Sequence, residues 1–409
     1  MRVDLLTREY PPNIYGGAGV HVNELARVLR KLVDVRVHAF DGPREPGQPG
    51  ADDGVIGYDY LPQLDQANAA LRTFGVDLLM AQGVEGTDLV HSHTWYANFG
   101  GHLAHLLHEV PHVISAHSLE PLRPWKAEQL AGGYNLSSFA EKTAYEGAQG
   151  IIAVSNGMRD DILRSYPAID PDKVYVVHNG IDLTDWTKPT TDEQKAEAAK
   201  TLKKFGIDPS IPTVVFVGRI TRQKGLPHLL RALRDIPKDS QIVLCAGAPD
   251  TKEIMQEVEG LVGELKKERD HVHFITEMLP RDQLVAILDA ATVFVTPSVY
   301  EPLGIVNLEA MAVDLPVVGT ATGGIPDVIV DGETGYLVPI DQMDDGTGTP
   351  LNPEQFHADL AERLTALLTD TDLAARMGKA GRQRVEDKFA WSTIGDKTVE
   401  VYRQILAQN

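Results

Sequence analysis

The stretch Thr292-Val-Phe-Val-Thr-Pro-Ser-Val-Tyr-Glu301-Pro-Leu-Gly-Ile-Val-Asn-Leu-Glu309 predicts both the fold class and the place of a ligand site. Its first five residues have the apolar composition of a buried strand, and a helix is expected from about Leu303 through Ala312. A strand that leads directly into a helix is the unit of an open α/β sheet, in which ligands bind at the carboxyl ends of the strands. We therefore expect Glu301 on a loop at that edge and Glu309 within the helix.

The start of this helix has the properties of an anion site. The first N–H groups of a helix lack partners within it and lie at the positive end of its dipole, so Leu303, Gly304 and Ile305 are expected to hold a donor phosphate. Carboxylates repel phosphate, which suggests that Glu301 and Glu309 accept hydrogen bonds from a sugar ring and a ribose. A nucleoside diphosphate sugar contains both a sugar ring and a ribose, with a diphosphate between them. The alternative interpretation is a solvated loop glutamate and an ordinary helix glutamate.

Length and charge narrow the class of protein. The chain has 409 residues, too many for one core, so two domains are expected. The net charge of −20 argues against nucleic acid or an anionic membrane as a partner, although local Arg and Lys residues can still hold a nucleotide. A single cysteine, Cys245, excludes a disulfide framework and is expected in a buried strand. We recognise no leader and no long apolar run, and therefore expect a cytoplasmic protein.

The first half of the chain alternates patterns of strand and helix. Short apolar runs fit buried strands, and between them apolar residues recur at helical spacing, as in Leu25, Val28, Leu29 and Leu32. This alternation is typical of a parallel sheet with helices on both faces. The expected strands are 3–6, 33–40, 88–92, 112–116, 150–155 and 174–178, and the expected helices are 20–32, 61–79, 97–108, 125–148 and 157–166.

The second half restarts the alternation after a connector, 182–210, which is rich in Pro, Thr and Asp. We expect an α/β protein of two doubly wound, Rossmann-like domains that face each other across a cleft, with residues 1–184 on the acceptor side and 185–389 on the donor side. Residues 390–409 are expected to pack back on the first domain. The expected strands are 213–217, 242–246, 272–275, 292–296, 316–320 and 335–339, followed by helices 356–368, 374–387 and 392–407.

Two glycine-rich turns follow expected strands. Gly16-Gly17-Ala-Gly19 does not have the G-x-G-x-x-G spacing of a dinucleotide site, but its glycines allow close approach of the backbone to a ligand, so Gly16 and Gly17 are candidate donor contacts. Gly323-Gly324-Ile-Pro-Asp approaches the same ligand from the side or serves only as a structural turn. For the first turn, the alternative is a plain helix start.

Cations follow the first strand of the second half. Arg219 is expected at the end of that strand and Lys224 at the start of the next helix. Two cations that converge on this edge suit a diphosphate and would neutralise charge on a leaving group. The alternative is a solvated basic loop.

Histidines end two adjacent strands. The chain has 14 histidines, and His93 and His117 lie where they would share a metal or face a ligand. We find no H-E-x-x-H or C-x-x-C pattern and therefore expect no metal. His117 is instead a candidate sugar contact.

The segment after His117 mixes aromatic and basic residues. Aromatic faces bind sugar rings and cations bind phosphate, which suggests a site for an acceptor that carries an anion. The alternative is a surface loop with one anchoring tryptophan. The candidate acceptor residues are Arg123, Trp125, Lys126, Tyr134 and Lys142.

Together these motifs resemble the retaining GT-B glycosyltransferases of family four, over nearly the whole chain. The first-loop sequence Ile14-Tyr-Gly-Gly-Ala lacks the lysine of the Lys-Thr-Gly-Gly-Leu loop in the neighbouring starch synthases, which argues against their mode of acceptor binding. Longer likenesses, such as His91-Ser-His-Thr-Trp-Tyr, indicate a branch that builds glycogen-type bonds. The matching motifs are the first Gly-Gly loop, Ser115-Ala-His117, His178-Asn-Gly-Ile-Asp182, Gly218–Gly225, the Glu301/Glu309 pair and Gly323-Gly-Ile-Pro-Asp327.

The resemblance implies roles for the donor residues. Arg219 and Lys224 would bind the diphosphate, and the loop of Gly17 would cover it. Glu301 would contact glucose hydroxyls, and Glu309 the ribose.

It also implies a reaction. Glucose would pass from ADP-glucose to glucose 1-phosphate, giving maltose 1-phosphate, or to the ends of glycogen. The configuration would be retained by a front-face substitution without a metal, with the carbonyl of His117 near the anomeric carbon.

Other readings stay open at this point. They are a related transferase that uses UDP-glucose, a UDP-sugar epimerase of the same architecture, and a hinge-bending sugar-binding protein, which would require a secretory leader and show no turnover. The oligomeric state is also open, with a homodimer compatible with the sequence.

Overall fold

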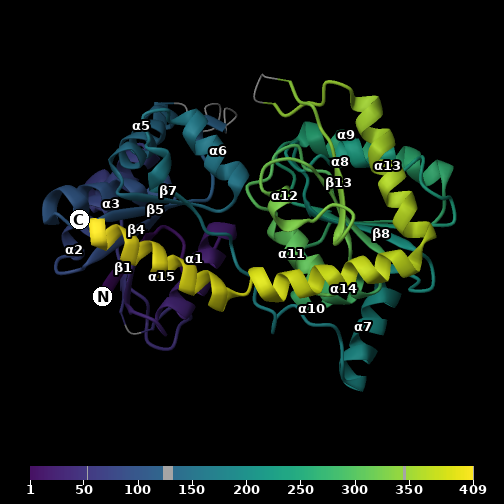
Figure 1. Ribbon diagram of the computed structural model, residues 1–409, viewed down its shortest axis with the longest axis horizontal. Coiled ribbons are helices and arrows are strands. Elements are labelled where there is room, and N and C mark those ends of the chain that lie inside the picture. Colours follow the sequence, from purple (N-terminus) through teal and green to yellow (C-terminus); the bar gives the residue numbers. More distant parts are fainter. Residues whose placement is uncertain (53, 123–131, 344–346, 409) are drawn as a thin grey trace. The chain divides into compact units, whose positions relative to one another are not determined.

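The computed structural model describes residues 1–52, 54–122, 132–343 and 347–408, which form two compact units (Figure 1). Unit 1 consists of residues 1–180 and 391–409, and unit 2 consists of Ile181–Ala390. The first boundary lies a few residues before the expected position. The reason is that Ile181 N donates a hydrogen bond to the carbonyl of Phe389 (2.8 Å), so the connector begins as part of unit 2.

Unit 1 is built on a seven-stranded sheet with the order β3-β2-β1-β4-β5-β6-β7, and all of the described strand pairs are parallel. The strands are β1 (Arg2–Thr7), β2 (Asp34–Ala39), β3 (Val55–Gly57), β4 (Leu89–His93), β5 (His112–Ala116), β6 (Gly150–Ala153) and β7 (Val174–Val176). The helices are α1 (Gly17–Leu29), α2 (Ala69–Gly83), α3 (Trp95–His108), α5 (Gly132–Gly147), α6 (Asn156–Ser165) and α15 (Trp391–Gln408), with short 3-10 helices η1 (Pro62–Leu64), η2 (Glu120–Leu122) and η3 (Pro171–Lys173).

The last helix of the chain, α15, packs in unit 1 against α1 and one face of the sheet (Figure 1). Its buried residues include Trp391 and Ile405, and the Tyr402 hydroxyl lies 2.6 Å from Nδ1 of His91 on β4. The backbone at Gly150 approaches so closely that an added Cβ would lie 2.3 Å from Cδ1 of Ile405. Helix α15 is therefore part of the core of unit 1, although it is last in the sequence.

Unit 2 is built on a six-stranded parallel sheet with the order β10-β9-β8-β11-β12-β13. The strands are β8 (Thr213–Arg219), β9 (Gln241–Gly247), β10 (Val272–Ile275), β11 (Val293–Thr296), β12 (Val317–Thr320) and β13 (Gly335–Val338). The helices are α7 (Asp192–Phe205), α8 (Leu226–Ala232), α9 (Lys252–Glu268), α10 (Arg281–Asp289), α11 (Ile305–Met311), α12 (Ile325–Val328), α13 (Pro353–Thr369) and α14 (Thr371–Lys388).

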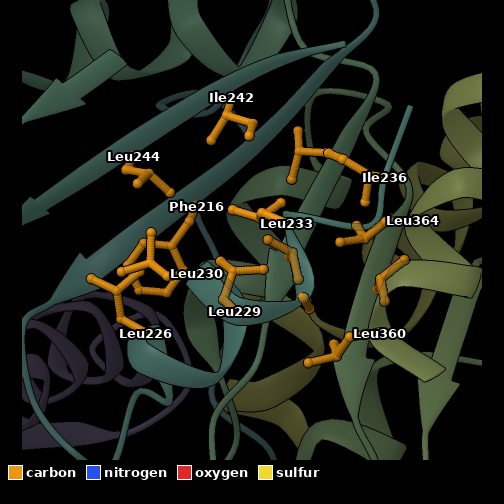
Figure 2. Close-up of a cluster of buried hydrophobic side chains, with 14 of the residues drawn as sticks. Phe216, Leu226, Leu229, Leu230, Leu233, Ile236, Ile242, Leu244, Leu360 and Leu364 are labelled. Atoms are coloured by element: carbon orange, nitrogen blue, oxygen red, sulfur yellow. The ribbon is translucent and has the colours of Figure 1, made fainter. Parts of the chain in front are cut away.

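The core of unit 2 lies between its sheet and helices α8, α9 and α13. Figure 2 shows Leu229 and Leu230 of α8, together with Leu233, beside Phe216 of β8, and Leu360 of α13 closes the same cluster. All of these side chains are at most 2% exposed. Each buried leucine contributes roughly 1.5–3 kcal/mol relative to an exposed one, so this core holds β8 firmly beneath the loop that follows it.

Two local features of unit 1 differ from the sequence expectation. The expected helix 61–79 is divided into η1 and α2, because the Asn68 side chain accepts a hydrogen bond from Ala70 N (2.9 Å) and caps α2. Strand β3 was not predicted, because Val55–Gly57 is too short to show a period of two. Residues 125–131, the first part of the helix expected over 125–148, lie outside the described residues.

Cys245 lies in β9 and is buried, as predicted, and burial raises the pKa of its thiol to about 12. Among the described helices, none combines the length and the apolar composition needed to cross a membrane.

Candidate active site

The loop from Pro297 to Gly304 leaves the carboxyl end of β11 and turns sharply into α11. Gly304 has a φ of 88°, a left-handed conformation, and an added Cβ would lie 2.6 Å from Nδ2 of Asn307. This glycine forms the N-cap, so α11 begins at Ile305 rather than at Leu303 as expected. The Thr296 hydroxyl donates a hydrogen bond to Oδ1 of Asn307, which joins the strand to the helix.

Two neighbouring loops hold this loop in place. On one side, Val299 N donates to the carbonyl of Gln223 (2.9 Å), in the loop after β8. On the other side, Gly324 N donates to the carbonyl of Glu301 (2.8 Å). Gly323 has a φ of 53°, and its added Cβ would lie 2.0 Å from the same carbonyl oxygen. The Gly323-Gly324 turn therefore supports Glu301, which is the structural alternative left open by the sequence.

Lys224 and Glu301 form an ion pair across these loops. Lys224 Nζ lies 2.6 Å from Oε2 of Glu301, and the two side chains are 22% and 8% exposed. The Ser298 hydroxyl donates to the same carboxylate oxygen at 3.1 Å. Gly225 permits the approach, because its added Cβ would lie only 1.9 Å from the carbonyl oxygen of Pro297. Two residues that the sequence assigned to different parts of one ligand are thus in direct contact.

Arg219, at the end of β8, points into solvent and is also paired. Its guanidinium lies 2.5 Å from Oδ1 of Asp250, and its side chain is 64% exposed. The sequence analysis missed Asp250, which follows β9, the strand beside β8. A hollow of about 480 Å³ adjoins Asp250 and is lined by Pro249, Asp250, Thr251, Lys252, Met255 and Gln256.

Glu309 lies half-buried on α11 and differs from Glu301. Burial raises the pKa of its carboxyl to about 7, although the positive charges of Arg281 and Lys224 oppose this shift. Within the described part of the chain, no hydrogen bond or ion pair joins its carboxylate to another side chain. The carboxylate is therefore an available acceptor for a ligand hydroxyl group.

In unit 1, His117 directly follows β5 and contacts His93 at the end of β4. Nε2 of His117 lies 3.1 Å from Nδ1 of His93, so one of these two nitrogens carries the shared hydrogen. Burial lowers the pKa of His117 to about 4 and keeps the imidazole neutral near pH 7. Strand order explains the contact, because β4 and β5 are neighbours in the sheet.

His21 of α1 joins this pair. Its ring centroid lies 4.6 Å from that of His117, and one nitrogen from each of His21, His93 and His117 lies within 4.8 Å of the others. Burial lowers the pKa of His21 and of His93, so all three are neutral, and neutral imidazoles are ligands for transition metals. The geometry is compatible with an ion, and the expectation that no metal is present stays a prediction.

The first glycine loop is held by a residue that the sequence analysis did not single out. Oε2 of Glu9 accepts hydrogen bonds from Tyr15 N (2.8 Å) and Gly16 N (2.7 Å). An added Cβ at Gly19 would lie 2.7 Å from Cβ of Glu9, whereas one at Gly17 would meet nothing within 4 Å. Gly19 is thus required for packing, and Gly17 leaves an open backbone surface at the start of α1.

Comparison with known proteins assigns the chain to a family. Residues 15–185 match the model of Glycosyltransferase Family 4, and residues 198–384 match the model of Glycosyl transferases group 1. The chain is 52% identical over 409 residues to alpha-maltose-1-phosphate synthase of Mycolicibacterium smegmatis, with 100% of each chain covered. It is 51% identical over 407 residues to the protein of that name from Mycobacterium tuberculosis, again with full coverage.

The chain belongs to the group 1 glycosyltransferases.

Solved structures agree with the fold of this glycosyltransferase. Sucrose-phosphate synthase from Thermosynechococcus elongatus has a TM-score of 0.73 at 24% identity, with 100% of each chain covered. Anabaena HepE, in complex with UDP and glucose, has a TM-score of 0.74 at 20% identity and covers 99% of this chain and 100% of its own. These likenesses confirm the expected GT-B fold of two parallel α/β sheets.

The expected acceptor residues of the glycosyltransferase are placed only in part. Arg123, Trp125 and Lys126 lie outside the described residues. The Tyr134 hydroxyl donates to the carbonyl of Glu120 (3.0 Å). Lys142 is 61% exposed on α5, 3.9 Å from a carboxylate oxygen of Glu146.

Proposed function

We propose that this glycosyltransferase moves glucose from ADP-glucose to the 4-hydroxyl of glucose 1-phosphate and so forms maltose 1-phosphate. The observation that carries the proposal is the identity of 52% over the full length of both chains with a protein named alpha-maltose-1-phosphate synthase. Identity of this extent supports transfer of the activity as well as of the fold. The donor base, the retained configuration and a role in glycogen synthesis belong to the same proposal.

The proposed reaction requires no protein nucleophile. The bond between glucose C1 and the diphosphate oxygen breaks, a bond between C1 and O4 of the acceptor forms on the same face, and the 4-hydroxyl proton passes to the departing ADP. Negative charge grows on the diphosphate as the bond breaks, and a positioned cation stabilises that charge most strongly in the transition state.

Lys224 and Arg219 are the cations proposed for this role. Arg219 ends β8 and Lys224 lies in the loop after it, at the carboxyl edge of the unit 2 sheet. Lys224 is paired with Glu301, and Arg219 is paired with Asp250. A diphosphate would draw Lys224 toward itself and free Glu301 to accept hydrogen bonds from glucose hydroxyls. The ion pair thus keeps both groups ordered at the position where each is used.

Glu309 is proposed to accept a hydrogen bond from the donor ribose. Its carboxyl has no competing partner among the described side chains, and its pKa of about 7 means that both protonation states are populated near neutral pH. A hydroxyl donor favours the ionised form, so ribose binding would lower this pKa. The open backbone of Gly17 is proposed to approach the diphosphate, together with Gly16 and the residues Leu303, Gly304 and Ile305 at the start of α11.

His117 is proposed to contact the transferred glucose. Its imidazole is neutral, because burial lowers its pKa to about 4, and it shares a hydrogen with His93. A neutral imidazole in this arrangement can exchange hydrogen bonds with a sugar hydroxyl without adding a positive charge. This leaves the stabilisation of the leaving group to the cations of unit 2.

The test is a nucleotide-release assay with identification of the product. ADP-glucose or UDP-glucose is offered against glucose 1-phosphate or glycogen, in all four combinations. ADP release with glucose 1-phosphate, together with a maltose 1-phosphate product of α configuration at the new bond, is the expected result. Release only with glycogen would replace the proposed acceptor by a glucan, and release only from UDP-glucose would replace the donor.

A further inference from the structure

Unit 1 contains a cavity of about 340 Å³ at the edge of its sheet where the strands end. Arg8 directly follows β1, and Trp95 and Tyr96 begin α3 directly after β4. The volume of the cavity falls within the range of small-molecule sites. The lining residues with polar or aromatic side chains are Arg8, Tyr60, Asn68, Arg72, Thr73, Trp95 and Tyr96.

Two arginines of the lining are held by aromatic rings rather than by carboxylates. Cζ of Arg8 lies 4.2 Å from the centre of the Tyr96 ring, and Cζ of Arg72 lies 4.5 Å from that of Tyr60. Stacking fixes the plane of a guanidinium and leaves its N–H edge available for hydrogen bonds. Among the described residues, neither guanidinium has an ion-pair partner, and Nε of Arg72 is buried without a hydrogen bond.

Two arginines without ion-pair partners in the described part of the chain are unusual in a protein with so large an excess of acidic residues. The sequence has 58 acidic and 38 basic residues, so carboxylates are in excess. Yet none of the described residues that line the cavity is acidic. Burial raises the pKa of Tyr60, and the charge of Asp41 adds to this shift, but Asp41 is not part of the described lining and accepts a hydrogen bond from the Tyr15 hydroxyl (3.3 Å). A cavity with two unpaired cations and no carboxylate in its wall selects for an anion.

The start of α2 and two aromatic residues complete the wall of the cavity. Nε1 of Trp95 is buried without a hydrogen-bond partner among the described residues. Asn68 and the first residues of the 15-residue helix α2 are part of the wall, and this helix end carries a partial positive charge. The rings of Trp95 and Tyr96 stack with their centres 4.2 Å apart and both residues line the cavity, so part of its wall is apolar.

We infer that this cavity binds the acceptor, glucose 1-phosphate, with its phosphate on Arg8 and Arg72 and its sugar ring beside Trp95. The inference rests on the proposed function and names residues for its acceptor. Trp95 lies two residues after His93, which contacts His117, so one lining residue is close in the chain to the histidines proposed to contact the transferred glucose. The end of a glucan has no phosphate, so the two arginines would distinguish between the two acceptors.

The first experiment is steady-state kinetics of Arg8→Ala, Arg72→Ala and the double variant. Each single change is expected to raise the KM for glucose 1-phosphate about 10-fold or more, the effect of losing one charge-assisted hydrogen bond, with the KM for the nucleotide sugar within about twofold. Arg72→Lys should restore part of the affinity. Arg2→Ala is the matched control, because Arg2 begins the strand that ends beside Arg8 and its side chain pairs with the exposed Asp34. An unchanged KM for glucose 1-phosphate in the double variant would overturn the inference.

A second experiment separates this inference from the proposed function. Glucose 1-phosphate is titrated calorimetrically into the wild-type protein and the folded variants, without a donor. Binding by the wild type that weakens about 10-fold in Arg72→Ala supports the cavity, even where no maltose 1-phosphate is produced and the proposed reaction fails. Equal binding by the wild type and the variants, or no binding by either, would overturn the cavity assignment, even where the wild type makes maltose 1-phosphate.

Discussion

Lys224 and Arg219 of unit 2 are paired with carboxylates, whereas Arg8 and Arg72 of the unit 1 cavity have no ion-pair partner among the described residues. Lys224 lies 2.6 Å from Glu301, and Arg219 lies 2.5 Å from Asp250. Such a pair holds its cation in place and also offers a carboxylate to sugar hydroxyls. This suits a ligand with both a diphosphate and a sugar.

In unit 1, Arg8 and Arg72 are held by Tyr96 and Tyr60. A ring orients a guanidinium without neutralising it, so the full positive charge stays available. Under the proposed function, two parallel sheets with the same kind of ligand edge would select different ligands through what stands beside each cation. A cation paired with a carboxylate suits a ligand that carries both phosphate and hydroxyl groups, and a cation held by an aromatic ring suits a compact sugar phosphate.

The largest effect is expected from Lys224→Ala. Turnover should fall on the order of 100-fold or more, because a positioned cation at the leaving group is lost and Glu301 is left without its partner. Initial rates at saturating substrates provide the measurement, and Glu301→Ala should show a loss of similar size. Lys204→Ala is the control, since Lys204 forms an exposed pair with Glu277 at 2.7 Å. Near-normal turnover of Lys224→Ala would show that the Lys224–Glu301 ion pair has no role in the reaction.

Glu309→Gln tests the unpaired carboxyl of unit 2 through stability. The folded-state pKa of about 7 lies above the ordinary value of 4.5, so the folded protein binds more protons between these values and loses stability as the pH rises. The side chain of the glutamine variant does not titrate, so the variant does not lose this stability as the pH rises. Denaturant unfolding should show the variant gaining on the order of 2 kcal/mol relative to the wild type between pH 5 and pH 8. The same difference at both pH values would contradict the buried carboxyl.

Gly17 and Gly19 of the first loop are expected to differ in role, with Gly19 needed for packing and Gly17 for approach to the ligand. Gly19→Ala places a Cβ 2.7 Å from Cβ of Glu9 and should lower stability by about 1–3 kcal/mol, measured as a fall in Tm. Gly17→Ala meets no atom within 4 Å, so its Tm should stay unchanged. A rise in the KM for the nucleotide sugar in Gly17→Ala would then report contact with the ligand. A fall in Tm of Gly17→Ala comparable to that of Gly19→Ala would refute the distinction.

The smallest effect is expected from removal of metal ions. Because Lys224 and Arg219 are proposed to supply the charge that the leaving group needs, treatment with a chelator should leave the rate unchanged. The check is activity before and after dialysis against the chelator, with the metal content measured in parallel. Chelation would instead reveal an ion at His21, His93 and His117 if it removes activity and a divalent ion restores that activity. In that case His21→Ala should prevent the restoration.

Much of the architecture follows from local sequence. Alternating apolar runs and helical patterns predicted nearly every strand, and the parallel order placed the residues after each strand at one edge. Arg219, Lys224, Glu301 and His117 could therefore be identified as candidates, because strand ends are visible in the chain. The exceptions were local as well, since β3 is too short for a period to show and the start of α11 depends on the φ of Gly304.

The partners of those residues were decided by tertiary structure alone. Lys224 meets Glu301 because β8 and β11 are neighbours in the sheet, although 77 positions separate the two residues. Within unit 1, His21 of α1 meets His93 and His117, and Glu9 of the preceding loop binds the backbone of Tyr15 and Gly16. The cavity gathers Arg8, Tyr60, Arg72 and Trp95 from distant segments. Sequence periodicity fixes which face of an element is buried. Only the strand order and packing determine which side chains meet at the sheet edge, because those contacts join residues that no local pattern connects.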